Sequence, residues 1–406
     1  MIEFIQNNLA FVIFVILLSI FLYVKRKNLE VSGPFPLMYM MMYKTTWGLS
    51  KMTHWSSKHP TLFLYLAYLS AFIGIVGMFA SFIFMFWQLG FIVDNGITQG
   101  GGLVLPIQTE NGLDSAVPVF YVPFVYWIIA LFILAIVHEF AHGVISERFK
   151  VKIKSSGFAF LGIIVPLMPA AFVEPDQIEL NKISWWKKVA VMGAGSTSNF
   201  IFGFLFLAVW IFAAGPLIDK TMELENIKFN SVMNQSGLYN QIESGEIVSF
   251  NGEYDTIQIY KDFQNLTPNE VITLEIESID ESNNTKVENY TFETFENLDN
   301  NKKGMIGISG LEMNLVNKEE YSWIGAFPEG FERAIFWIWF LNIAIGIMNL
   351  LPIWITDGGQ VSSTIFRKFC GKVWGNRIYH TLSWIVLLLI FFTMKPQFLF
   401  SLMGIN

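Results

Sequence analysis

The sequence predicts a polytopic α-helical membrane protein of about six transmembrane helices, with a small α+β domain inserted between spans four and five. Hydrophobic residues make up 53% of the 406-residue chain and charged residues only 15%, whereas about a quarter of a soluble domain is charged. Six apolar runs approach or exceed the length of about 20 residues that crosses a bilayer. Between residues 219 and 332 the pattern changes to short alternating runs, which indicates a domain outside the bilayer.

The apolar runs are residues 9–24, 62–93, 117–146, 189–218, 334–355 and 378–394. Basic residues follow the first run directly and no small-residue cleavage site does, so we expect an anchor helix rather than a removed signal peptide. The second run carries no charge and is long enough either to tilt or to break near Gly74 and Gly77.

The distribution of basic residues predicts the orientation in the membrane. If the cluster at 25–27 is cytosolic, the loops on that side hold 17 of the 26 Lys and Arg residues, and the loop at 94–116 holds none. The acidic insertion would then lie outside the cell membrane. Residues 34–60 mix methionines, aromatic residues and basic residues, which predicts an interfacial helix or loop on the cytosolic surface.

Residues 155–175 test this orientation, because a further membrane crossing there would place every later loop on the opposite side of the membrane. The segment is apolar, but its two glycines and three prolines interrupt a helix. We therefore favour strands or a re-entrant loop at membrane depth over a spanning helix, provided that protein or water satisfies the backbone.

Charge and cysteine content exclude several classes of site. The net charge is −7 and the chain has no sustained basic patch, which argues against a nucleic-acid partner. The single cysteine, Cys370, excludes an intrachain disulfide and a cysteine-rich zinc or iron–sulfur site.

The insertion at 219–332 contains 22 acidic residues, 7 lysines and three predicted strands in EIVSFNG, VITLEIE and NYTFETF. Gly237, the Asn251-Gly252 turn, a helix over 255–266 and a closing strand in 304–313 resemble a PDZ domain of membrane proteases, although Glu246 stands where Asp is usual. The resemblance implies that the domain binds or screens an extended peptide at a sheet edge. A generic α/β spacer is the alternative.

The third apolar run contains the motif HExxH at His138, Glu139 and His142. Residues i and i+4 share one face of a helix, so both imidazoles can reach one zinc ion, and the carboxylate beside them can act as a general base. Ionisable residues inside a membrane are costly and usually functional. If the helix meets the cytosol near Arg148, His138 lies about 15 Å inside it.

The third metal ligand is expected to be Asp357, at the cytosolic end of the fifth run and therefore at a matching depth. Pro352 breaks that helix, and Gly358-Gly359 allows a sharp turn. Two histidines and a carboxylate would leave one coordination position open. The remaining histidines, His54, His59 and His380, are expected to be interfacial. An ordinary Asp-Gly surface turn is the alternative for Asp357.

HExxH on one span and N-x-x-P-x-x-x-x-D-G (349–358) on a later one resemble the signature of the site-2 protease family of intramembrane zinc metalloproteases. FVEP (172–175) is similar to the archaeal and eukaryotic-type branch. The resemblance covers roughly residues 120–360. It implies that His138, His142 and Asp357 bind one zinc ion per chain, that Glu139 is the general base and that Asn349 positions the substrate. Gly195 and Asn199 match a G-x-x-x-N element on span four, and we expect Asn199 also to bind substrate.

The predicted activity is hydrolysis of a peptide bond within or near the transmembrane segment of a membrane-protein substrate. The resemblance implies an earlier extracytoplasmic cut by a site-1 type protease, which the PDZ-like domain would monitor. An ion-coupled transporter is one alternative; it would usually show inverted repeats, and zinc content would separate it from a protease. A non-catalytic PDZ-bearing membrane scaffold is the other, and the intact Glu139 argues against it. The sequence does not indicate the oligomeric state.

Four segments follow from these predictions. They are 1–116, the N-terminal anchor helices and interfacial segment; 117–218, the first half of the protease core; 219–332, the PDZ-like domain; and 333–406, the second half of the core with the last helix.

Overall fold

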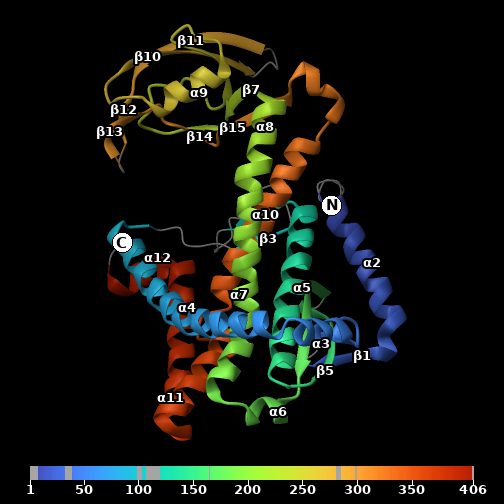
Figure 1. Cartoon of the computed structure of the whole chain (residues 1–406). Coiled ribbons are helices and arrows are strands. Elements are labelled where there is room, and N and C mark those ends of the chain that lie inside the picture. Colours follow the sequence, from blue (N-terminus) through green and yellow to red (C-terminus); the bar gives the residue numbers. More distant parts are fainter. Residues whose placement is uncertain are drawn as a thin grey trace. The chain divides into compact units, whose positions relative to one another are not determined.

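The computed structural model describes residues 8–32, 39–97, 103–106, 119–163, 165–279, 285–297 and 300–404 (Figure 1). The chain divides into two compact units, one formed by Met1–Trp210 with Arg333–Asn406 and the other by Ile211–Glu332. The predicted segment boundary at residue 116 lies outside the described residues.

Within the described residues, six helices are long and apolar enough to cross a membrane, which confirms the predicted number. They contain α2 (Leu9–Lys25), α4 (Pro60–Asp94), α5 (Phe124–Arg148), α7 (Trp185–Val209), α10 (Phe327–Met348) and α11 (Asp357–Met394). The first span continues beyond α2 to Asn28, and the fourth continues beyond α7 to Thr221. Shorter helices are α3 (Leu49–Lys58), α6 (Gln177–Lys182), α8 (Gly215–Thr221), which follows α7 through the π-turn η2 (Trp210–Ala214), and α12 (Pro396–Met403), with 3-10 turns η1 (Arg26–Asn28) and η3 (Glu319–Ile324).

The predicted limits of the last two spans were wrong. The helix α10 ends at Met348, well before Pro352, because proline cannot donate the next backbone hydrogen bond. The helix α11 begins at Asp357 rather than at residue 378, because the Thr356 hydroxyl caps its first turn. A non-helical backbone at Gly371 (φ 77°) divides α11, and the predicted sixth run is its second half.

The helix α4 runs unbroken through Gly74 and Gly77, so these glycines mark close packing and not a break. A Cβ atom on Gly193 of α7 would lie 2.3 Å from the carbonyl oxygen of Ser70 on α4. Small residues thus let the two helices approach closely, as is common between membrane helices. The core between α4, α5, α7 and α11 includes Ala67, Met78, Ile145, Val189, Ala194 and Val361.

A four-stranded antiparallel sheet in the first unit has the order β1-β2-β5-β6. Its strands are β1 (Leu29–Ser32), β2 (Tyr39–Thr45), β5 (Ile153–Ile163) and β6 (Val165–Pro175). Residues 155–175 therefore form a strand pair and not a spanning helix, as favoured. Within residues 34–60 the sequence indicated only a helix or loop; α3 is that helix, but β2 was missed because its partner β5 lies more than a hundred residues away.

The second unit contains a five-stranded sheet of order β11-β10-β9-β7-β15. The strands are β7 (Met222–Phe229), β9 (Gly245–Phe250), β10 (Val271–Ile279), β11 (Thr285–Glu293) and β15 (Glu312–Asn317), with helix α9 (Thr256–Gln264) packed on β7 and β9. The short strands of this unit are β8 (Ser231–Val232), β12 (Phe295–Asn297), β13 (Asn300–Met305) and β14 (Ile308–Ser309), whereas β3 (Leu103–Leu105) and β4 (Val119–Tyr121) pair with each other in the first unit. The PDZ assignment of the second unit remains a prediction.

Candidate active site

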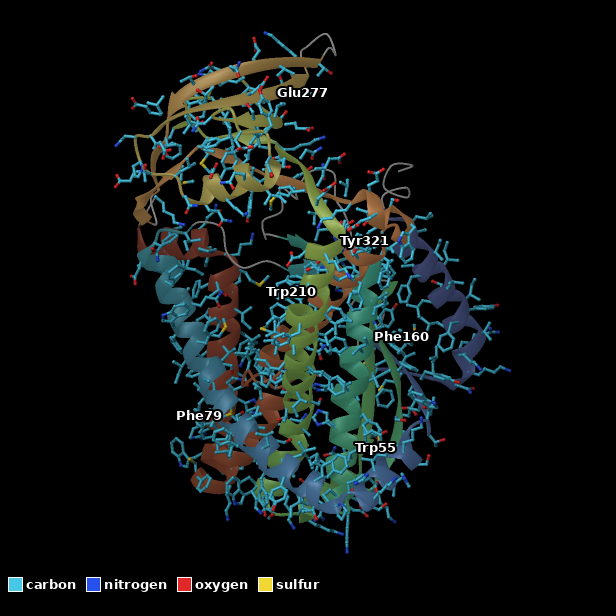
Figure 2. The ribbon with its side chains drawn as sticks, turned by 45° about the horizontal axis from the view of Figure 1, so that its top comes forward. Trp55, Phe79, Phe160, Trp210, Glu277 and Tyr321 are labelled. Atoms are coloured by element: carbon cyan, nitrogen blue, oxygen red, sulfur yellow. The ribbon has the colours of Figure 1, made fainter. Side chains whose placement is uncertain are left out.

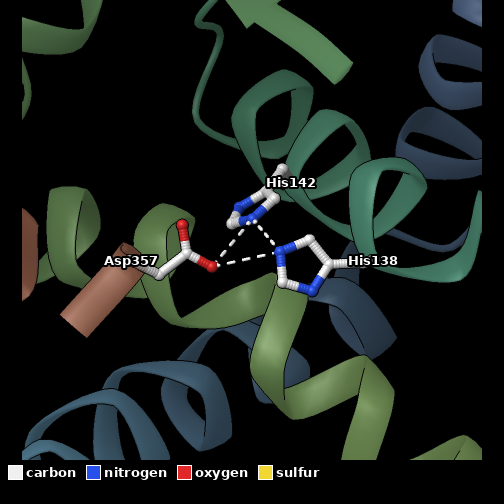
Figure 3. Close-up of side chains that lie close together, drawn as sticks. All are labelled: His138, His142 and Asp357. Carbon is white, nitrogen blue, oxygen red and sulfur yellow. Dashed lines mark hydrogen bonds and ion pairs between the residues drawn. The ribbon is translucent and has the colours of Figure 1, made fainter. Parts of the chain in front are cut away.

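Two spans bring together the side chains of His138, His142 and Asp357 (Figure 3). The histidines lie one helical turn apart on α5, and Asp357 is the first residue of α11. The two Nε2 atoms are 3.2 Å apart, and each is 3.2 Å from Oδ2 of Asp357. All three side chains are largely buried.

This triangle of atoms fits a metal ion. A tetrahedral zinc ion with bonds of about 2.0–2.1 Å holds its ligand atoms about 3.3 Å apart. The Nδ1 atom of His142 lies 2.6 Å from the carbonyl oxygen of Val191, to which it donates, so the neutral ring turns the lone pair of Nε2 into the triangle. In the described part of the chain Oδ2 of Asp357 receives no hydrogen bond. Buried lone pairs that converge in this way need a cation or protons between them.

A tight turn between α10 and α11 places Asp357. The Gly358 N–H donates to the carbonyl oxygen of Asn349 at 2.7 Å. A Cβ atom on Gly358 would lie 2.0 Å from the carbonyl oxygen of Leu350, so only glycine fits this approach. The Thr356 hydroxyl accepts from the Gly359 N–H and so caps α11, whose first residue is Asp357. The positive end of the helix dipole favours the negative charge of the Asp357 carboxylate at this position.

A glycine on α7 forms the floor beneath the two imidazoles. A Cβ atom on Gly195 would lie 2.4 Å from Nε2 of His138 and 2.4 Å from Nε2 of His142. Such an atom would occupy the space toward which both ring nitrogens point. The glycine therefore keeps open the volume that a metal ion would fill.

Asn199, one helical turn after Gly195, is fully buried, and its Nδ2 lies 3.1 Å from Nδ1 of His138. Its Oδ1 has no hydrogen-bond partner in the described structure. Rotating the amide by half a turn would bring Oδ1 to His138 as an acceptor, and the two orientations are distinguished only by such networks. The sequence suggested a contact between Asn199 and substrate, whereas the structure places its amide against His138.

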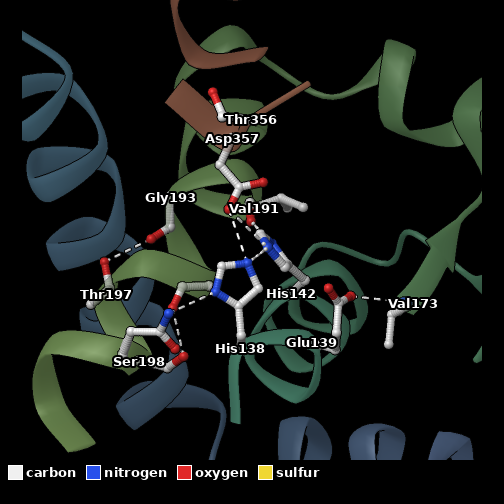
Figure 4. Close-up of polar contacts among 12 residues, drawn as sticks. His138, Glu139, His142, Val173, Val191, Gly193, Thr197, Ser198, Thr356 and Asp357 are labelled. Atoms are coloured by element: carbon white, nitrogen blue, oxygen red, sulfur yellow. Dashed lines mark hydrogen bonds and ion pairs between the residues drawn. The ribbon is translucent and has the colours of Figure 1, made fainter. Parts of the chain in front are cut away.

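Glu139 lies beside the metal triangle, where its Oε2 accepts from the Val173 N–H of β6 at 2.8 Å (Figure 4). Glu139, His142 and Asp357 line one cavity of about 410 Å³. The sheet supplies much of its wall, including Met40, Met42, Lys44, Phe172 and Glu174. The arrangement gives a carboxylate, a candidate metal centre and an open volume in one place, which is what hydrolysis requires.

A comparison with known protein families decides which hydrolysis this is. The family model described as Peptidase family M50 matches residues 126–393. The chain belongs to peptidase family M50, the site-2 protease family. It is therefore a metalloendopeptidase and an integral membrane protein, of a family that acts on membrane-protein substrates in the bilayer. A relative from Methanocaldococcus jannaschii, named uncharacterized protein MJ0971, is 26% identical over 298 residues, which cover 71% of this chain and 70% of the relative.

The cavity of this M50 protease also contains an ion pair that the sequence did not reveal. The Lys44 ammonium lies 3.3 Å from Glu174 and 2.8 Å from Glu30, so it ties β2 to both β6 and β1. The Ser155 hydroxyl, which donates to Glu174 at 2.7 Å, and the Lys44 ammonium hold the pKa of the Glu174 carboxyl below its usual value. The pair fixes the outer strands of the cavity wall to each other.

The other candidate residues of the protease fall into two groups. The carbonyl oxygen of Asn349 accepts from the Gly358 N–H, which places Asn349 near the site. That its side chain positions the substrate remains a prediction. His54, His59 and His380 are not part of the His–His–Asp group found among the described residues. The Val191 carbonyl was missed, because a backbone acceptor leaves no signal in the residue type.

Proposed function

We propose that this M50 protease cuts a peptide bond within or near the transmembrane segment of membrane proteins, using one zinc ion held by His138, His142 and Asp357. The observation that carries the proposal is the 3.2 Å triangle of ligand atoms beside Glu139 in a shared cavity. A bound zinc ion would supply a Lewis acid and lower the pKa of a coordinated water to about 7.

Glu139 would receive the proton of the attacking water and pass it to the leaving amine. Its bond from the Val173 N–H fixes one carboxylate oxygen and keeps the group directed along the cavity. Burial of the triangle limits competing water, which strengthens the electrostatic interactions between its groups.

The substrate would bind as an unwound strand, because the amides of a helix are locked in internal hydrogen bonds. Strand β6 is an edge strand of its sheet, and on that edge the Val173 N–H donates to Glu139 of α5. An extended segment added beside β6 would pass Glu139. Asn349 would position that segment.

The membrane orientation completes the proposal. The active site would face the cytosol, the second unit would lie outside the cell membrane, and the substrate would first be cut there by another protease. Membership of family M50 favours this function over an ion-coupled transporter, and the intact Glu139 favours it over a non-catalytic scaffold.

Zinc binding by the triangle is tested with Asp357→Ala. The purified wild-type protein is expected to hold about one zinc ion per chain. The variant is expected to lose zinc affinity by more than about 100-fold, because even outer residues of zinc sites contribute 10–100-fold. Asp262→Ala, a half-buried aspartate on α9 in the second unit, is the control. Full zinc occupancy in Asp357→Ala would exclude Asp357 as a ligand.

We also propose that Asn199 orients His138 rather than binding substrate. If Oδ1 accepts from Nδ1–H, the Nε2 lone pair turns toward the triangle, because a histidine that binds zinc through one ring nitrogen donates a hydrogen bond from the other. Asn199→Ala is expected to weaken zinc affinity by about 10–100-fold, and Asn199→Asp, which keeps an acceptor, to restore most of it. Asn342→Ala removes another fully buried asparagine as a control. A change in KM alone, at unchanged zinc affinity, would show that Asn199 binds substrate and does not orient His138.

A further inference from the structure

A second cavity, of about 300 Å³, lies between α3, α4, α5 and α7. Its wall on α5 consists of apolar residues that include Val137, Phe140 and Val144. At 3.6 residues per turn these side chains lie on the opposite face of α5 from His138 and His142. None of the residues that line this cavity also lines the catalytic cavity, so the two cavities are separate.

The walls of this cavity offer almost nothing to water. The hydroxyl of Thr197 donates to the carbonyl oxygen of Gly193, and that of Ser198 to the carbonyl oxygens of Val137 and Gly195. Their donors are thus already used within the helices. An apolar cavity without polar partners does not hold water and suits hydrocarbon.

The surroundings of the cavity indicate the source of that hydrocarbon. The helices α4, α5 and α7 are all long and apolar enough to span the membrane. Ile201 of α7 lines the cavity and is also 43% exposed, so it marks an edge that faces the bilayer. A hydrocarbon chain can reach the cavity from lipid without crossing water.

The short helix α3 adds charge complementarity. Lys51, Trp55 and Lys58 are spaced i, i+4 and i+7 and therefore share one stripe of α3. Trp55, which is labelled in Figure 2, lines the cavity. The opposite stripe is buried against α5, where a Cβ on Gly143 would meet the Met52 sulfur at 2.3 Å. Both lysines are exposed. Two ammonium groups beside an apolar cavity match the head group and tail of an anionic lipid.

We infer that this cavity binds one hydrocarbon chain of an anionic membrane lipid, whose head group lies on the Lys51–Lys58 stripe of α3. Trp55 packs edge-on against Phe140 at 5.5 Å between ring centroids, and Phe140 follows the general base Glu139 in the chain. A bound hydrocarbon chain would therefore pack against α5 next to Glu139 and stabilise the position of this helix. The inference does not depend on the proposed peptidase function.

The test uses the full chain reconstituted in nanodiscs that contain phosphatidylglycerol and phosphatidylcholine. Native mass spectrometry after release measures the lipid retained by each protein. The wild type is expected to retain phosphatidylglycerol selectively. Ile201→Trp should fill the cavity and abolish retention, and Lys51→Gln with Lys58→Gln should weaken it roughly 30-fold, at about fivefold for each lysine.

Matched controls are Leu205→Trp, an exposed residue one turn further along α7, and the pair Lys368→Gln with Lys372→Gln on α11. Both controls should retain lipid as the wild type does. Equal retention by Ile201→Trp and the wild type, or equal retention of both lipids by the wild type, would overturn the inference. Photocrosslinking from position 201 to a substrate helix instead of to lipid would also overturn it.

Discussion

Glu139→Gln is expected to lower kcat for peptide-bond hydrolysis by about 10²–10⁴-fold, the contribution of a positioned general acid–base group, while zinc content stays unchanged. Glutamine has almost the same shape and can still accept from the Val173 N–H through its carbonyl oxygen. It cannot take a proton from water. The measurement is cleavage of a single-span membrane protein in proteoliposomes, together with zinc per chain.

The matched control is Glu147→Gln, two helical turns further along α5 and outside the residues that line the catalytic cavity. It removes the same charge from the same helix and is expected to leave kcat unchanged. Wild-type cleavage by Glu139→Gln would exclude the assigned role of Glu139. Loss of zinc in the same variant would show instead that Glu139 supports the metal centre.

Features of the fold that depend on local sequence could be predicted. The runs that became α4 and α5 are predominantly apolar, and the glycines and prolines in residues 155–175 favoured strands or a re-entrant loop over a spanning helix. The strand β2 could not be predicted, because a methionine-rich run becomes a strand only when it pairs with β5. The start of α11 was also missed, since a polar first half of a helix carries no hydropathy signal.

In the candidate site, too, local features could be predicted from the sequence and features that depend on helix packing could not. The i, i+4 spacing of His138 and His142 is local, so their shared direction followed from helix geometry. Asp357 was selected through depth and motif, and the structure places it 3.2 Å from both ring nitrogens. The partners behind the histidines, the Val191 carbonyl and the Asn199 amide, depend on how α7 packs on α5, which no local pattern states.

Gly195→Ala is expected to reduce zinc affinity and proteolysis together, by about 100-fold or more, the upper range for residues that support zinc ligands. The added methyl group would lie 2.4 Å from Nε2 of both His138 and His142, well inside contact distance. To remove this steric overlap, the two imidazoles would have to turn away or α7 would have to move away from α5. Zinc titration against a competing chelator measures the first effect, and cleavage measures the second.

Gly203→Ala on the same helix separates this effect from general packing damage. Its added Cβ would also be crowded, at 2.6 Å, but against the terminal carbon of the flexible Ile343 side chain, which can shift. The control should therefore keep its zinc and lose at most some stability. Full zinc binding by Gly195→Ala would mean that the imidazoles point elsewhere in the working enzyme. Loss in Gly195→Ala alone would show that a bare backbone at this position keeps the metal centre open.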